Sequence, residues 1–187
     1  LNIASVEVRN ADIRFRDVQS QALWRLQSLN VSGSNVNPVS PFPLKTMFTL
    51  TKHNRLDAEA LERPPELTSD IDLETRIRLQ LAEDHVVLEN IRLNTQTRMG
   101  AEGEPQRLSL KAAEMIARMD EKQLSISEGV LEAGLQNAEK WQGSLALALA
   151  FGLESNWQAQ TAQLKNFQLT GPDGLRMSGH LNVEQMF

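Results

Sequence analysis

The sequence predicts an all-β protein: a long curved antiparallel meander sheet, shaped like a trough and built from repeated strand pairs with bulges. Three observations predict this fold class. Short runs of alternating apolar and polar residues dominate the chain, turn-forming stretches separate them, and helical periodicity is nearly absent. With 187 residues, of which 41% are apolar, the chain can bury a core as a single β-domain over residues 1–187.

Period-two alternation predicts strands in seven runs, in order 13–15, 44–50, 71–81, 86–93, 108–119, 145–153 and 175–183. Turn-rich pieces such as ERPPELTSD and GPDG separate them. Within KAAEMIARMD, residues 111–120, the Ala, Glu and Met residues favour a helix by propensity. The alternating RLSL before this segment and QLSIS after it favour a strand, which we predict because sheet context overrides propensity.

One strand motif recurs along the chain. VEVRNADI (6–13), VVLENIRL (86–93) and AQLKNFQL (162–169) align Asn10, Asn90 and Asn166, and the weaker copy LSISEGVLEA places Glu128 at the same position. The interval from Asn90 to Glu128 equals the interval from Glu128 to Asn166, and the interval from Asn10 to Asn90 is slightly more than twice as long. This spacing predicts a unit of about 40 residues with a divergent copy near residue 50. Propeller blades have a similar period but need about four strands per unit, and the pattern here favours two.

The apolar parity changes at each of these positions, as from Leu88 to Ile91 and from Leu164 to Phe167. An extra residue in a strand moves later side chains to the other face and sharpens the twist, and Asn tolerates the left-handed backbone that a bulge needs. We therefore expect Asn10, Asn90 and Asn166 to form a shared line of bulges that bends the sheet into a trough with an apolar concave side. The alternative is pairs of short strands at the corners of a β-sandwich.

The segment LALALAFGL, residues 145–153, is apolar on both of its faces. A strand of this kind is typical of a core between two layers, and in a single curved sheet it would instead line an apolar groove. Under the groove hypothesis, the candidate lipid-contacting residues are Leu145, Leu147, Leu149, Phe151, Leu153, Ile13, Phe15, Ile91, Leu93, Phe167 and Leu169.

Composition argues against several classes of function. The net charge is −5 without a run of Lys or Arg, so we expect no nucleic-acid partner. The chain has no Cys, and His53, His85 and His180 have no His or Cys at ligand spacing, so we expect no metal site and no cofactor. No nucleophile, acid–base or phosphate-loop motif occurs, which predicts a protein that is not an enzyme. The longest apolar run is too short to span a membrane, and the absence of an initial Met suggests a piece of a longer protein, so an anchor could lie outside it.

The segment 1–50 resembles the AsmA family of Gram-negative envelope proteins. The matching motif positions are Asn10, Ala11, Ile13 and Asp17, then Leu26, Leu29 and Val31, then Pro41, Phe42 and Leu44. The rest of the chain resembles the same C-terminal periplasmic region more diffusely. The resemblance implies a periplasmic segment of a single-pass inner-membrane protein, related to bridge-like lipid-transfer proteins.

Two hypotheses for function follow. In the first, the chain acts in outer-membrane biogenesis and binds or conducts phospholipid acyl chains along an apolar groove between the inner and outer membranes. In the second, it is a non-catalytic envelope scaffold or interaction domain that influences outer-membrane protein assembly through protein partners. A hydrolase or carbohydrate-active module is disfavoured, because no catalytic constellation is present.

Overall fold

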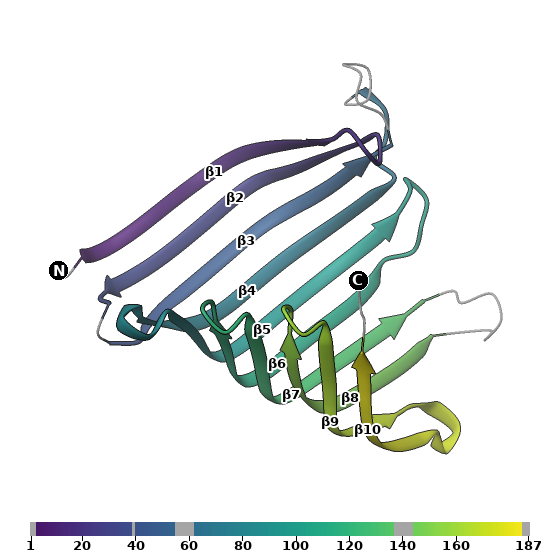
Figure 1. Cartoon of the computed structure of the whole chain (residues 1–187). Coiled ribbons are helices and arrows are strands. Elements are labelled where there is room, and N and C mark those ends of the chain that lie inside the picture. Colours follow the sequence, from purple (N-terminus) through teal and green to yellow (C-terminus); the bar gives the residue numbers. More distant parts are fainter. Residues whose placement is uncertain (1–2, 39, 55–61, 137–143, 185–187) are drawn as a thin grey trace.

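The computed structural model describes residues 3–38, 40–54, 62–136 and 144–184, and it consists of one ten-stranded sheet (Figure 1). Each strand pairs antiparallel with its neighbours in the sequence, in the order β1 to β10. The sheet is open, with β1 and β10 at its two edges. The predicted curved antiparallel meander is therefore confirmed.

The strands are β1 (Ile3–Asp17), β2 (Ala22–Val36), β3 (Phe42–His53), β4 (Leu67–Gln80), β5 (His85–Met99), β6 (Gln106–Arg118), β7 (Gln123–Leu135), β8 (Leu145–Asn156), β9 (Thr161–Thr170) and β10 (Arg176–Glu184). Two single-turn 3-10 helices, η2 (Leu81–Glu83) and η3 (Pro172–Gly174), lie in hairpin connections. The helix-favouring segment beginning at residue 111 lies in β6, because pairing with β5 and β7 over the whole strand outweighs its local propensity.

Left-handed backbone occurs at the three predicted bulge positions and at Glu128, the equivalent position of the weaker copy. The φ angle is 51° at Asn10, 54° at Asn90, 50° at Glu128 and 48° at Asn166. The strand register shifts beside each of them, for example between Glu74 and Arg76 opposite Asn90. The bulges expected from the recurring motif are thus confirmed.

The expectation of one line through all three Asn residues is wrong for Asn10. Asn90 lies between Leu88 and Ile91, whereas Asn10 lies between Val8 and Ile13, and the strand pairings place it at a different level of the sheet. Asn10 is matched instead by Ser28 in β2, whose φ angle is 53°. Because both strands carry an extra residue there, their register is the same before and after the two bulges.

The divergent copy expected near residue 50 contains no bulge. Strand β3 covers this position, has no residue with positive φ and pairs with β4 without a register shift. Its pairing with β2 shifts only where Ser28 inserts the extra residue in the partner. The period of about 40 residues therefore describes the C-terminal half of the sheet better than the N-terminal half.

The sheet bends where Asn90, Glu128 and Asn166 lie, and Figure 1 shows β5 to β9 turning back on themselves at one end. Ile91 and Ala112, each 5% exposed, are on one side of this bend. The three bulge residues on the other side are exposed. Burial does not mark the face of Ile91 as the concave one, because Val87 on the opposite face is only 1% exposed and a hollow lined by Glu128 and Asn166 lies on that opposite face. The expected apolar concave side is therefore not confirmed.

No second layer covers the sheet in the described part of the chain. The sandwich alternative is therefore wrong, and β8 with its LALALAFGL segment is an internal strand of a single sheet. The residues of this segment are half-buried, apart from Ala146, which is exposed. Burial comes from neighbouring strands and from the bend, because there is no opposing layer to supply it.

Candidate functional site

A continuous row of side chains crosses the sheet from β1 to β10. Directly paired residues of antiparallel strands place their side chains on the same face, so a chain of such pairs defines a ladder. The leucine ladder consists of Val8, Val31, Thr46, Leu73, Leu93, Leu110, Leu131, Leu149, Leu169 and Met177. Thr46 is its only residue that is not apolar.

A second ladder runs parallel to the leucine ladder on the same face. It consists of Phe42, Ile77, Leu88, Met115, Ile126, Leu153, Leu164 and Leu181, from β3 to β10. All of its members are apolar. The two ladders line the two walls of the bend, and neither contains a charged residue.

Between the two ladders lies the crease, with one residue from each strand. It consists of Val6, Gly33, Leu44, Thr75, Ile91, Ala112, Gly129, Phe151, Phe167 and Gly179. Small residues fit where the bend leaves least room, and a Cβ atom on Gly129 would lie 2.8 Å from Cζ of Phe151. The Phe151 ring thus lies directly over Gly129 and fills the crease there.

The bulges keep both ladders on one face. In β5 the step from Leu88 to Leu93 is five residues, whereas in β4 the paired step from Leu73 to Ile77 is four. An odd step would ordinarily turn the side chain to the opposite face, and the left-handed residue Asn90 absorbs the extra position. The parity switch in the sequence therefore does not mean that one strand buries two faces.

All eleven candidate residues from the sequence lie on this apolar face. Leu93, Leu149 and Leu169 belong to the leucine ladder, Ile91, Phe151 and Phe167 to the crease, and Leu153 to the second ladder. Further along the same face lie Leu145 and Leu147 in β8, and Ile13 and Phe15 in β1. Ile13 is 48% exposed and Phe15 62% exposed, because the edge strand has no neighbour to cover them.

Beyond the leucine ladder, away from the crease, polar residues interrupt the apolar face. Ser69 and Thr97 are paired there and share a hydrogen bond of 2.8 Å between their hydroxyls, and Thr95 and Gln106 lie beside them. Leu145 and Ile13 are on opposite sides of this polar patch. The crease and its two ladders are therefore the continuous apolar track, and the outer candidates are separated from one another.

Much of this track was not predicted from the sequence, including Leu73, Leu110 and the whole second ladder except Leu153. The repeat period in the sequence pointed to most of the second ladder. The interval from Asn90 to Glu128 also separates Ile77 from Met115 and Met115 from Leu153. The same interval relates Leu88, Ile126 and Leu164. Extending the period from the Asn position to its apolar neighbours would have found six of the eight members of the second ladder.

A cavity of about 1110 Å³ lies on the opposite, polar face. Two rows of polar-face residues line it across β2 to β9, including Asn30, Met47, Asp70, Asp72, Asn94, Gln96, Arg107, Ser109, Glu132, Ala148 and Thr170. The row of strand residues between them, Phe48, Ile71, Thr95, Leu108, Ala133 and Leu147, also contributes to its lining. No wall residue of the apolar track contributes to it. We place the candidate site on the apolar face nevertheless, since polar side chains of β2 to β7 interrupt the lining of this cavity, among them the hydrogen-bonded pairs Thr49–Asp70 at 2.7 Å and Ser109–Glu132 at 2.9 Å.

Ion pairs gather on the polar face. Lys45 and Glu74 are 2.6 Å apart across β3 and β4, and this hydrogen bond lowers the pKa of the Glu74 carboxyl and raises the pKa of the Lys45 amine. Lys165 and Glu154 are likewise 2.6 Å apart across β8 and β9. The two faces are thus sharply different, one ionic and one apolar, as expected of a sheet whose apolar face meets an apolar ligand or partner.

Among the described residues, no helix has the length and apolarity needed to cross a membrane.

Comparison with protein families, with curated proteins and with solved structures found no match for this chain. The resemblance to the AsmA family rests on the sequence motifs of segment 1–50 and stays a prediction.

Proposed function

We propose that this chain binds phospholipid acyl chains along the crease and its two ladders, as a non-catalytic periplasmic segment of an AsmA-like protein that moves lipid between the inner and outer membranes. One observation carries the proposal: an apolar track crosses an open sheet from edge to edge, and no layer of the described chain covers it. Soluble proteins rarely leave a contiguous apolar surface of this extent without a ligand or partner.

The energetics favour this type of ligand. Exposing an acyl chain of about 16 carbons to water costs about 0.8 kcal/mol per CH₂, or roughly 12 kcal/mol in total. A continuous apolar track offsets most of this cost at every point along its length, so a chain can slide without crossing a large barrier. Head groups stay in water at the open side of the trough.

The scaffold hypothesis has its own supporting observation. Both edges of the sheet, β1 and β10, have free backbone groups, and exposed apolar side chains outside the track, such as Phe15 and Val183, lie along them. An open edge of this kind can pair with a strand of another protein. This role is compatible with lipid binding, because the edge and the track are different surfaces.

Lipid extraction and native mass spectrometry of detergent-free protein test the proposal. We expect phospholipid to copurify with the protein, and its absence would contradict lipid binding. Met177→Asp in the leucine ladder should reduce the bound lipid while leaving the fold intact, because Met177 is already 55% exposed. Met47→Asp on the polar face is the matched control, with 43% exposure, and should retain lipid. Loss of lipid in the control alone would place the ligand in the cavity of the polar face.

A further inference from the structure

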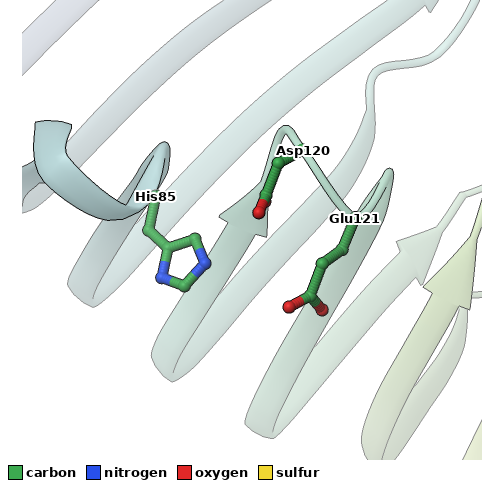
Figure 2. A group of neighbouring side chains, drawn as sticks. All are labelled: His85, Asp120 and Glu121. Atoms are coloured by element: carbon green, nitrogen blue, oxygen red, sulfur yellow. The ribbon is translucent and has the colours of Figure 1, made fainter.

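Three metal-ligating side chains converge at the rim of the trough, away from the apolar track. His85 begins β5, and Asp120 and Glu121 lie in the turn between β6 and β7. One ligand atom from each of the three lies within 4.8 Å of the others. Figure 2 shows the imidazole and the two carboxylates directed toward a common space from these two segments.

A carboxylate lies beside the imidazole, on the side away from Asp120 and Glu121. Nδ1 of His85 is 3.5 Å from Oε2 of Glu83, and the other ring nitrogen is on the side that faces Asp120 and Glu121 (Figure 2). Metal-binding histidines commonly use one nitrogen for the ion and direct the other to a carboxylate or carbonyl, which fixes the ring. The His85 side chain is 19% exposed.

One backbone hydrogen bond joins the two turns, and a side chain of β8 supports the second of them. The Met119 N–H donates to the carbonyl of Asp84 at 3.1 Å, and the side-chain amide of Asn156 donates to the carbonyl of Glu121 at 3.4 Å. The next pair of turns repeats the first contact, since the Trp157 N–H donates to the carbonyl of Lys122 at 2.8 Å. Hydrogen bonds that involve none of the three side chains of His85, Asp120 and Glu121 therefore support these turns.

The repeat supplies an internal comparison. One repeat interval after His85, Asp120 and Glu121, the chain has Gln123, Gln158 and Ala159. The neighbouring turns keep the same backbone contact without a metal-ligating set, so the hairpin architecture does not require these three side chains. Their convergence in one pair of turns is a separate property of the sequence there.

We propose that His85, Asp120 and Glu121 bind one divalent transition-metal ion of the Zn²⁺ class, which links the β4–β5 turn to the β6–β7 turn. One imidazole and two carboxylates suit zinc, with water in the fourth position. Glu83 and Asp84 add negative charge, while Arg118, paired opposite His85, and Lys122 oppose it. Ligand spacing in the sequence does not reveal this site, because its ligands come from turns that only the sheet pairing brings together.

Isothermal titration of the whole chain with zinc chloride at pH 7 tests the site. We expect one zinc ion per chain, with affinity reduced more than about tenfold in His85→Ala and in the conservative variants Asp120→Asn and Glu121→Gln. His180→Ala, which removes a histidine of β10, is the control and should bind like the unchanged protein. Circular dichroism checks that each variant is folded.

Two results would overturn the proposal: no zinc binding by the unchanged chain, or binding that His85→Ala leaves unaltered. Calcium chloride titrated in the same way should bind more weakly than zinc, because calcium prefers oxygen ligands and gains little from an imidazole. Equal affinity for the two ions would assign binding to the carboxylates alone and would also overturn it. The zinc site does not depend on lipid binding, and either proposal can fail without the other.

Discussion

Replacing Asn90 tests whether the bulge residues determine the shape of the sheet. Asn90 has a φ angle of 54° and is exposed at the bend. The change Asn90→Val therefore removes no buried contact, and its cost comes from the backbone. Left-handed backbone costs an ordinary L-residue about 1–2 kcal/mol, and a β-branched residue is among the least suited to it. We expect a loss of unfolding free energy of about 1–2 kcal/mol.

Two further changes at this position separate backbone conformation from residue count. Asn90→Gly should be within about 0.5 kcal/mol of the original, because glycine adopts positive φ without a steric penalty. Deleting Asn90 should cost far more, since one arm of β5 would turn over and remove side chains such as Val86 and Leu88 from the apolar face. At about 1.5–3 kcal/mol for each side chain, the loss is about 3–6 kcal/mol, a large share of the stability of a domain.

Urea unfolding followed by circular dichroism measures these differences. The control is Asn94→Val, at an exposed position of the same strand that lacks positive φ and has regular pairing to Asp72 and Ser109. Its effect should stay within about 0.5 kcal/mol. If Asn90→Val were as stable as the unchanged chain, or if Asn94→Val lost as much, the left-handed backbone would not be what fixes the bend.

Further predictions concern the edge strand and the crease. The hydrogen bond from Arg25 lowers the pKa of Asp12 below 3.8, so this pair stabilises the β1–β2 contact above pH 3.8 and the contribution is lost as the pH falls through the lowered pKa. In urea titrations, Asp12→Asn should reduce the unfolding free energy at pH 7 and should match the original protein at pH 2. If the variant were also less stable at pH 2, the charge of Asp12 would not be the cause. Gly129→Ala should lower the unfolding free energy by about 1–3 kcal/mol, because the added Cβ meets the Phe151 ring. This loss should be smaller in a Phe151→Leu background. The control is Gly134→Ala, whose Cβ would lie 3.9 Å from Arg107 and which should be tolerated. An equal cost of Gly129→Ala in both backgrounds would show that the ring is not responsible.

Local sequence patterns were sufficient to predict the strands and most of the bulges. The alternation in β4 to β6 and the parity switch around Asn90 are consequences of one buried and one exposed face, and both are visible in a single strand. The resistance of residues 111–118 to helix formation was also predictable, because alternating segments flank them. These features depend on few neighbours in space.

Features that depend on how strands pair were not predictable from one sequence. Whether Asn10 shares a level with Asn90 depends on the accumulated register of four intervening strand pairs, and Ser28 compensates the first bulge only because β2 lies beside β1. The second ladder and the convergence of His85 with Asp120 likewise need the register of β5 and β6. A one-residue error in any pair would move these positions to another row or face.

Site-specific photo-crosslinking to phospholipid tests most directly whether the apolar face binds acyl chains. A photoreactive residue would replace Val8, Met177 or Leu181, which are exposed members of the two ladders in β1 and β10. In matched proteins it would replace Glu7, Arg176 or Asn182, their neighbours on the polar face. We expect lipid adducts at the three apolar-face positions and none at the three polar-face positions. Adducts of equal yield on both faces, or on the polar face alone, would contradict lipid binding along the crease and its two ladders.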